Sequence, residues 1–222
     1  MIQEWSKEKL RERYPYCTYI PDLVPSPELS YILGVRYGDL NVRNYNAVLI
    51  VKDKDFAEEF ARCSEVIMKR PYVVSGRYRV IVGSKALCDF LKLPLLEAHS
   101  YWIEEYPAEF LRGFFDSEGS PNIKPFICVS NCNKSLLYYV NRLLDIYFDI
   151  KSTVTTPPSS IKRVGKIRPI ISRKVSHILR ITGLDNVEKF LWEIGFSIQR
   201  KNEVLIDGLY NTSHPRWRSK YL

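Results

Sequence analysis

The sequence lacks the features that mark membrane proteins, disulfide-bonded proteins and zinc proteins. No apolar run among its 222 residues approaches the ~20 that a membrane helix needs. The five cysteines are odd in number and form neither a CxxC pair nor a Cys/His zinc pattern, which predicts mostly buried free thiols in a reducing compartment. The charged N-terminus does not resemble a signal peptide. We therefore expect a soluble intracellular (cytoplasmic) protein with no membrane partner.

Positive charge is in excess and unevenly distributed. The formal net charge is +8, and residues 151–222 hold 14 Lys and Arg against 5 Asp and Glu, so residues 1–150 sum to −1. Such an excess favours a polyanionic partner, because Lys and Arg neutralise nucleic-acid phosphates. On charge alone, a basic protein without such a partner stays equally open. The hydrophobic content of 45% predicts a folded chain rather than a disordered one.

Two segments 79 positions apart share an apolar run, a glycine, a small residue four positions later and then a carboxylate. In a helix, this spacing places the two small residues on one face, where they let two backbones approach closely. The carboxylate falls at the helix C-terminus, where the helix dipole disfavours negative charge. A divalent-metal site explains that placement better than stability does. The small residues are Gly34 and Gly38 in the first segment and Gly113 and Ser117 in the second, and the carboxylates are Asp39 and Glu118.

The paired segments resemble the motifs of the LAGLIDADG homing endonucleases, in the single-chain form that carries two copies and includes archaeal intron-encoded members. The second copy keeps the family pattern at Leu111, Gly113, Asp116 and Gly119, with Ser117 in place of alanine and Glu118 as the last acid. The first copy is looser, with Tyr37 where an inner acid is usual and Leu40 where a glycine is usual. Both copies end in an acid at the position that the resemblance assigns to metal binding.

The resemblance implies an α+β fold of two pseudo-symmetric αββαββα halves, with the motif helices packed at their interface and antiparallel sheets forming a DNA-binding saddle. A wider repeat supports the two halves: residues 48–55 align with 127–134 at the same offset, and residues 80–83 with 180–183 at an offset of 100. The chain then divides into an N-terminal extension (1–25), a first half (26–92), a connector (93–106) and a second half (107–222). The second half carries a basic insertion at 157–174, then a C-terminal helix and tail.

Local patterns predict the elements of each half. In the first half we expect helices over about 28–39, 54–68 and 84–92, and strands over about 41–44, 47–52, 71–75 and 78–83. In the second half we expect helices over about 107–118, 134–147, 184–194 and 198–210, and strands over about 121–124, 126–131, 151–156 and 174–182. Ser26 should cap the first motif helix, with Pro27 at its first position.

The resemblance also implies hydrolysis of DNA phosphodiesters with Mg²⁺, for which Mn²⁺ is a substitute. Asp39 and Glu118 would hold the metal, because Mg²⁺ takes one or two carboxylates together with waters and phosphate oxygens. The alternative is that both are ordinary helix-terminal acids. Asp116 is interpreted as structural, bonding a backbone group near the helix end. Residues implied to position water and offset phosphate charge, each of which could instead be a solvated surface residue, are Lys52 and Asn131, at matching strand ends, and Lys92 and Arg200, after the last helix of each half.

Residues predicted to bind DNA fall in both halves. Residues 161–174 carry six basic side chains and no acid, and their alternation with apolar positions suits a hairpin lying along a DNA groove. A solvated loop is the competing interpretation of this stretch. The predicted DNA contacts are Arg43, Tyr45, Arg77, Arg79, Lys124, Lys162, Arg163, Lys166, Arg168, Arg173 and Lys174.

The sequence therefore predicts a monomeric, site-specific endonuclease with internal pseudo-two-fold symmetry, which cleaves double-stranded DNA at a long asymmetric target during intron homing. A start at Met1 without flanking protein-splicing sequence favours an intron-encoded enzyme over an intein fragment. One alternative is an RNA-splicing maturase, or a DNA-binding regulator on the same scaffold, with cleavage lost. The acids at both motif ends speak against that loss. The other alternative is an unrelated α+β protein with accidental matches.

Overall fold

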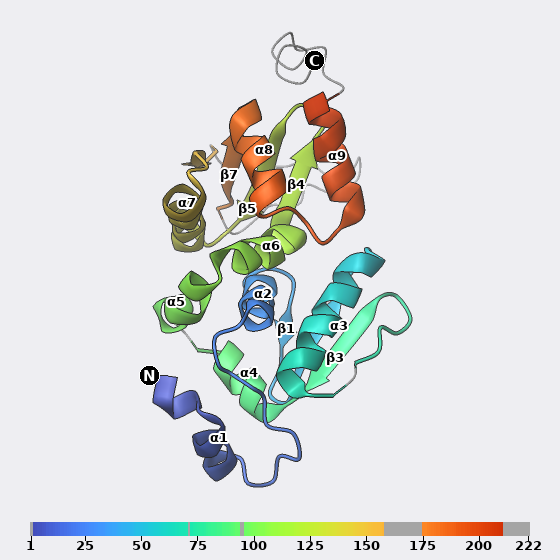
Figure 1. Cartoon of the computed structure of the whole chain (residues 1–222), viewed down its shortest axis with the longest axis vertical. Helices are drawn as coiled ribbons and strands as arrows, with labels where there is room; N and C mark the ends of the chain where they lie inside the picture. Colours follow the sequence, from blue (N-terminus) through green and yellow to red (C-terminus); the bar gives the residue numbers. More distant parts are fainter. Residues whose placement is uncertain (1, 71, 94–95, 158–174, 211–222) are drawn as a thin grey trace. The chain divides into compact units, whose positions relative to one another are not determined.

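The computed structural model describes residues 2–70, 72–93, 96–157 and 175–210, which form two compact α+β units (Figure 1). The described residues up to Ser117 and those of Ile194–Asn202 form the first unit, and the described residues of Glu118–Glu193 together with residues 203–210 form the second. Each unit has one antiparallel sheet. Among the described residues, no helix is both long and apolar enough to cross a membrane.

The first unit is built from the N-terminal elements and both motif helices. Its helices are η1 (Ile2–Trp5), α1 (Lys7–Arg13), α2 (Pro27–Arg36), α3 (Lys54–Met68), α4 (Lys85–Leu91), α5 (Leu96–Glu105) and α6 (Pro107–Glu118), and its strands are β1 (Asn41–Val42), β2 (Asn46–Ile50) and β3 (Arg79–Gly83). Ser26 caps α2, because its hydroxyl accepts a hydrogen bond from the Leu29 amide at 3.2 Å. The predicted N-cap is therefore confirmed.

The first sheet has the order β1-β2-β3, and its two faces differ in burial. Val48 is paired with Ile81 and Ala47 with Val82, so side chains of paired residues share a face. Ala47 and Val82 are buried on the inner face, whereas Ile81 is exposed on the outer face. The amphipathic helix α3 buries its apolar side and packs against both β3 and α2. On the outer face Val48 is buried as well, whereas Ile50, Arg79 and Ile81 stay accessible.

The second unit is built on the order β4-β5-β7-β6. Its elements are β4 (Gly119–Asn122), β5 (Phe126–Asn131), α7 (Lys134–Phe148), β6 (Ser152–Thr155), β7 (His177–Thr182), α8 (Leu184–Glu193) and the part of α9 (Gln199–Tyr210) that follows Asn202. Helices α7 and α8 cover the face that buries Ile127, Leu179 and Ile181. The opposite face carries Ser120, Cys128, Arg180 and Thr153 in one paired row across the four strands.

The structure differs from the local predictions at three places. The first motif helix ends at Arg36 rather than near residue 39, and Tyr37–Asp39 form a turn. The chain turns there because the amide of the buried Leu40 bonds back to the Val35 carbonyl at 3.1 Å. The connector contains the helix α5, which is held by Trp102: its buried indole N–H donates to the Leu23 carbonyl at 2.7 Å.

The predicted strand at 71–75 is also absent from the described residues 72–75, where Ser75 makes only an isolated bridge with Arg79. The bridge closes a tight turn that includes Gly76 at φ +53° and Tyr78 at φ +46°. Nearby, the Tyr72 amide donates to the Glu65 carboxylate at 2.9 Å rather than to a neighbouring strand. The first sheet consequently has three strands where four were expected.

Candidate functional site

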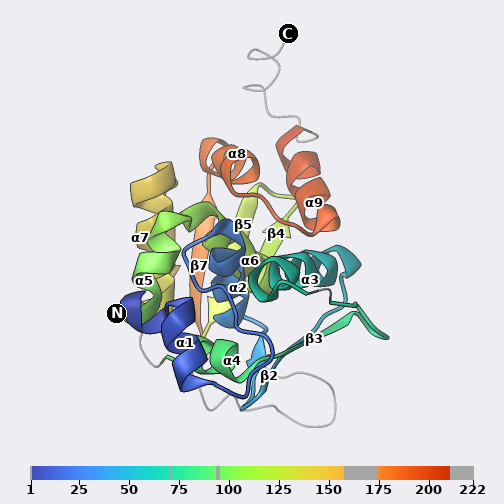
Figure 2. The same cartoon turned by 60° about the horizontal axis from the view of Figure 1, so that its bottom comes forward.

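The two motif helices cross at Gly34 and Gly113, with almost no space between their backbones. A Cβ atom on Gly34 would lie 2.1 Å from the Phe110 carbonyl oxygen, and one on Gly113 would lie 2.3 Å from the Tyr31 carbonyl oxygen. The contacts are reciprocal, since each glycine also meets the amide nitrogen of the residue just after the other glycine. A two-fold axis between the helices produces this reciprocity. Figure 2 shows α2 and α6 crossing at the centre of the first unit.

The other small residues of the motifs have different roles. Gly38 lies in the turn after α2, so it does not face the partner helix as part of a helical stripe. The Ser117 hydroxyl donates to the Gly113 carbonyl at 3.1 Å, one turn back in its own helix. The close approach that the sequence assigned to four residues is therefore made by Gly34 and Gly113.

The two motif acids lie five residues after their glycines, in different local settings. Asp39 is exposed in the turn after α2, and its carboxylate forms no hydrogen bond or ion pair with any residue that the structure describes. Partial desolvation raises the pKa of Asp39, and the positive charge of Lys201 acts in the opposite direction. Glu118 ends α6 and begins the second unit, where its Oε1 accepts a hydrogen bond from the side-chain Nδ2 of Asn131 at 3.3 Å. Both acids offer the oxygen ligands that Mg²⁺ prefers.

Asp116 is buried against the segment that leads into α9. Its carboxylate accepts hydrogen bonds from the Tyr31 hydroxyl at 2.8 Å, the Ser197 hydroxyl at 2.6 Å and the Ser197 amide at 3.0 Å. Burial raises the pKa of Asp116 to about 6, although these hydrogen bonds favour the charged form. The structural interpretation of Asp116 is confirmed, because the carboxylate ties two segments together and includes a backbone amide among its donors.

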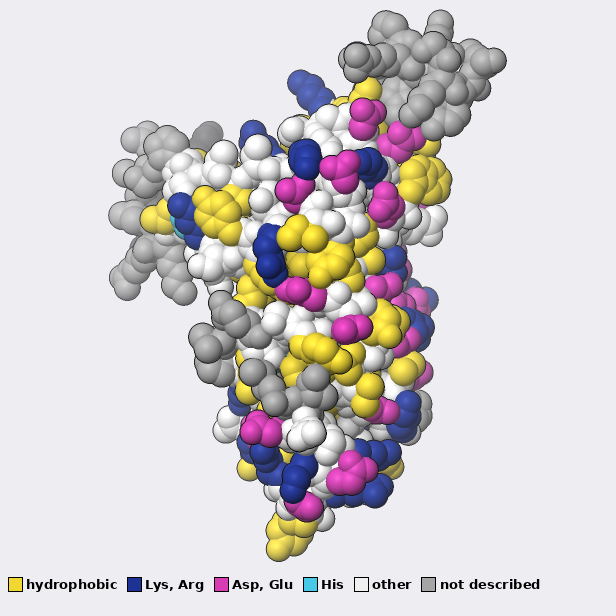
Figure 3. All heavy atoms as spheres, turned by 60° about the vertical axis from the view of Figure 1, so that its left-hand side comes forward, with side chains coloured by type: hydrophobic (Ala, Val, Ile, Leu, Met, Phe, Trp, Pro, Cys, Tyr) yellow, Lys and Arg dark blue, Asp and Glu magenta, His cyan; other side chains and the backbone are white. Residues whose placement is uncertain are grey.

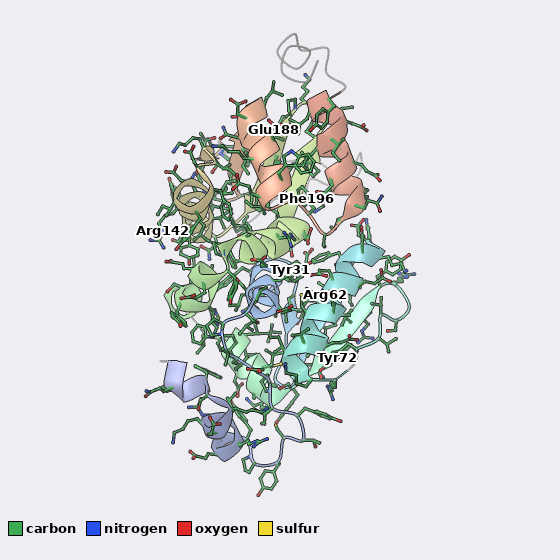
Figure 4. The ribbon with its side chains drawn as sticks, viewed as in Figure 1. Tyr31, Arg62, Tyr72, Arg142, Glu188 and Phe196 are labelled. Atoms are coloured by element: carbon green, nitrogen blue, oxygen red, sulfur yellow. The ribbon has the colours of Figure 1, made fainter. Side chains whose placement is uncertain are left out.

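Lys201 is a residue of this region that the sequence analysis missed. It is buried, and its ammonium donates to the Asp116 carbonyl at 2.6 Å and the Phe115 carbonyl at 3.2 Å. The same nitrogen lies 5.2 Å from the ring centre of Phe196, which Figure 4 labels just before α9. Burial lowers the pKa of Lys201 to about 8. A cation here satisfies carbonyls of the last turn of α6 and offsets the negative end of its dipole.

Arg200 and Lys52 lie beside Asp53, at the start of α3. The Arg200 guanidinium pairs with Asp53, with Nη2 2.7 Å from Oδ2, and this hydrogen bond is the main cause of a lowered Asp53 pKa. Lys52 is exposed in the bend after β2, and its charge also lowers the pKa of Asp53. Lys92, which was matched to Arg200 by sequence, instead donates to the Asn44 side chain at 3.2 Å. Lys92 and Arg200 thus have different kinds of partner.

Most of the described residues predicted to bind DNA lie on the outer sheet faces or in the turns beside them. Arg43 and Arg79 are exposed at the outer face of the first sheet, and Tyr45 is exposed in the turn between β1 and β2. Arg77 and Lys124 are exposed in the turns before β3 and before β5. The predicted contacts that lie outside the described residues are Lys162, Arg163, Lys166, Arg168, Arg173 and Lys174.

Arg180 is a further basic residue that the structure reveals on an outer face. It is exposed in the middle of β7, with its guanidinium 6.0 Å from the ring centre of Phe126. The sequence could have indicated this position, because the segment 177–182 alternates in the way typical of a half-buried strand. Arg180 therefore points to the face opposite the buried Leu179 and Ile181.

Comparison with known proteins agrees with this architecture. A family model described as a LAGLIDADG-like domain matches residues 105–195. The uncharacterized protein MJ0398 of Methanocaldococcus jannaschii is 34% identical over 203 residues, which cover 83% of this chain and 72% of that protein. A second uncharacterized protein of that organism, MJ0314, is 33% identical over 138 residues, which cover 52% of each chain. The chain belongs to the LAGLIDADG family and carries two motifs in a single polypeptide.

Solved structures share the fold at low sequence identity. The archaeal homing endonuclease I-DmoI, in a crystal structure with DNA and Mn, gives a TM-score of 0.57 at 22% identity, covering 78% of this chain and 98% of that one. The full-length DUF199/WhiA protein of Thermotoga maritima gives a TM-score of 0.52 at 18% identity, covering 92% of this chain and 66% of that one. At these identities the likeness establishes the fold.

Proposed function

We propose that this protein is a site-specific endonuclease that cleaves double-stranded DNA with the help of a divalent metal. One observation carries the proposal: α2 and α6 pack reciprocally through Gly34 and Gly113, and a carboxylate follows each glycine by five residues. A two-fold arrangement of motifs suits duplex DNA, because two-fold symmetry in a protein is mirrored by the two strands of its site. One acid per motif then gives each strand an equivalent set of metal ligands.

The chemistry divides between the metal and the side chains. When bound, Mg²⁺ lowers the pKa of a coordinated water and stabilises the developing charge on the phosphate oxygens. Asp39 and Glu118 would each offer carboxylate oxygens to a metal ion, and the side-chain amide of Asn131 would orient Glu118. Lys52 adds exposed positive charge beside the first sheet. I-DmoI has been crystallised with DNA and Mn, and variants of it with target DNA in the presence of Mn or Mg, which supports the choice of metals.

The outer sheet faces are the proposed DNA-binding surfaces. Arg43 and Arg79 on the first sheet and Arg180 on the second are exposed, whereas the opposite faces are packed against helices. Exposed guanidinium groups on an accessible sheet face can contact phosphates and guanine edges. The predicted monomer with internal pseudo-symmetry would place one sheet on each half of an asymmetric site.

A plasmid that joins the sequences flanking the gene, without the gene itself, provides the test. The protein should convert supercoiled plasmid into linear DNA in Mg²⁺ or Mn²⁺ and not in EDTA. A plasmid with the gene still in place should stay uncut, because the insertion interrupts the target. Tight binding of the joined sequence without cleavage in either metal would contradict the proposal and support the alternative, a DNA-binding regulator on the same scaffold.

A further inference from the structure

A groove of about 990 Å³ lies in the first unit between the segment after α1 and the start of α4. Helices α1 and α4 lie side by side in both ribbon views (Figures 1 and 2). The groove is lined by residues 12–19, by Tyr45 and Asn46 where the chain enters β2, by Arg70, and by residues 83–85. Its volume falls at the upper end of the range of about 300–1,000 Å³ typical of ligand sites.

Residues 14–19, which form one side of the groove, are held by side-chain contacts at both ends. The Tyr14 hydroxyl donates to the Asp89 carboxylate on α4 at 2.8 Å, and burial together with this bond raises the pKa of Tyr14 to about 12. At the other end, the Arg70 guanidinium lies 4.8 Å from the ring centre of Tyr19 and 5.0 Å from that of Tyr72. Figure 4 labels Tyr72 beside α3. The chain between these two anchors is therefore held in place against the unit.

Three tyrosine rings are left accessible around this held segment. Tyr16 is 99% exposed, Tyr45 is 64% exposed and Tyr19 is 46% exposed. Rigid aromatic rings that face water offer stacking surfaces for planar ligands. Burial in the core does not account for Tyr16, because nearly its whole side chain is in solvent.

Positive charge accompanies the rings. Arg70 donates to the Tyr72 hydroxyl and the Gly83 carbonyl, both neutral, and no carboxylate of the described residues pairs with it. Arg13 is exposed, with its guanidinium 5.4 Å from the ring centre of Trp5. Lys85 is paired with Asp89, and Glu12 is the acidic residue of the lining. Figure 3 shows Lys and Arg side chains gathered toward its lower end, with acidic side chains among them.

We infer that this groove binds unpaired nucleotides of single-stranded DNA, with bases stacked on Tyr16 and Tyr45 and phosphates neutralised by Arg13 and Arg70. Single-strand sites combine a basic groove with aromatic platforms in this way. Tyr45, in the turn between β1 and β2, and Asn46, the first residue of β2, both line the groove, so the site adjoins the proposed DNA surface of the first sheet. The choice of DNA over RNA rests on the proposed function, whereas the stacking site itself does not.

The test measures binding of a fluorescein-labelled oligothymidylate by anisotropy in EDTA, so that cleavage plays no part. Tyr16→Ala should weaken binding by about 5- to 100-fold, the effect of losing one stacked base. Tyr16→Phe should bind like the wild type, because the ring is kept. Arg13→Gln should make the dependence of log K on log salt shallower by roughly 0.7, the value for one phosphate contact on a single strand. Tyr138→Ala, at a 51% exposed tyrosine on α7, is the matched control and should bind normally.

Three results would overturn the inference: no oligothymidylate binding by the wild type, unchanged binding by Tyr16→Ala, or equal losses in Tyr16→Ala and Tyr138→Ala. Tighter binding of an oligouridylate RNA would overturn the assignment to DNA. Because Tyr16 is almost fully exposed, its variant should keep the wild-type melting temperature, and circular dichroism checks this. Failure of plasmid cleavage with oligothymidylate binding intact would contradict the proposed function and leave this site standing.

Discussion

His99 shows how burial fixes the protonation state of a side chain in the first unit. It is fully buried, with Nδ1 2.8 Å from the Tyr37 hydroxyl and Nε2 3.0 Å from the Phe90 carbonyl. A neutral ring satisfies both neighbours by donating from Nε2 and accepting at Nδ1. Burial lowers the pKa of His99 to about 4 from its usual value of 6.5.

This shift predicts a loss of stability in acid. Because the folded-state pKa lies below the unfolded value, the unfolded chain binds more protons between pH 6.5 and 4. The contribution of a neutral His99 is complete above pH 6.5 and is lost as the pH falls toward 4. The free energy of unfolding should therefore drop relative to His99→Gln by up to about 3 kcal/mol across this window. Urea unfolding of both proteins at several pH values measures this, and a constant difference would contradict it.

Lys201 should matter more to stability than its neighbour Arg200. Lys201→Met removes the donor to two carbonyls at the end of α6, which should cost about 1–3 kcal/mol. Arg200→Met breaks an ion pair whose arginine side chain is 63% exposed, and such surface pairs contribute about 0–1 kcal/mol. Thermal melting of the two variants at neutral pH compares them directly. Equal losses would show that the helix-end contacts of Lys201 add nothing.

The sequence predicts the position of Lys201 better than its role. Lys201, Leu205 and Leu209 are spaced by four, so the lysine falls on the apolar face of α9. The sequence pattern therefore predicts that Lys201 is buried and that Arg200 is not. Its partners were not readable, because the carbonyls of Phe115 and Asp116 lie more than 80 positions away in the chain. The role of Asp116 could be interpreted because the first motif has Tyr37 at the equivalent place.

At the scale of elements, the close crossing of α2 and α6 should reverse the usual effect of a Gly→Ala substitution on stability. Helix propensity alone predicts that Gly→Ala in a helix stabilises by about 0.5–1 kcal/mol. At Gly34 and Gly113 the added Cβ would lie 2.1 Å and 2.3 Å from carbonyl oxygens of the other helix. We expect Gly34→Ala and Gly113→Ala to destabilise by at least about 1–3 kcal/mol, because the helices must separate. Chemical denaturation measures the sign, and a gain in stability would refute the close crossing.

Elements with strong local patterns were predicted well, and elements set by distant contacts were not. Helices α3, α6 and α7 start at the expected residues, because each has a clear apolar face and, in α6, Pro107 stands at the first helical position. The end of α2 was missed because the burial of Leu40 sets it rather than a glycine cap. The helix α5 was missed because its anchor is the backbone carbonyl of Leu23, 79 positions from Trp102.

At the scale of the molecule, the sheet faces determine how DNA affinity should respond to salt. Arg43, Arg79 and Arg180 are exposed, so replacing all three with alanine should leave the melting temperature unchanged. If each contacts one phosphate, the slope of log K against log salt should become shallower by roughly 0.9 per residue. Replacing Lys9 and Lys54, which are exposed on α1 and α3, is the control and should leave the slope at its wild-type value. An unchanged slope in the triple variant would remove the sheet faces from DNA binding.

The sequence predicted only part of the organisation of the whole chain. The resemblance to the family implied the antiparallel sheets that the structure contains, and the repeat at an offset of 79 supported two related halves. It did not predict that residues 194–202 return to the first unit, where Ser197 and Lys201 meet the end of α6. That return lies beyond the repeated pattern and depends on tertiary contacts alone.

The most direct test of the account separates DNA binding from cleavage with Asp39→Asn and Glu118→Gln. Each variant should bind the joined flanking sequence with an affinity within about threefold of the wild type, because neither acid is proposed to contact a base. Neither variant should linearise the plasmid in Mg²⁺. Asp185→Asn and Glu58→Gln change exposed carboxylates on α8 and α3 in the same way and should cut at the wild-type rate. If one motif variant forms linear product at the wild-type rate, that acid is not a metal ligand. If both variants do so, the proposed nuclease site is contradicted.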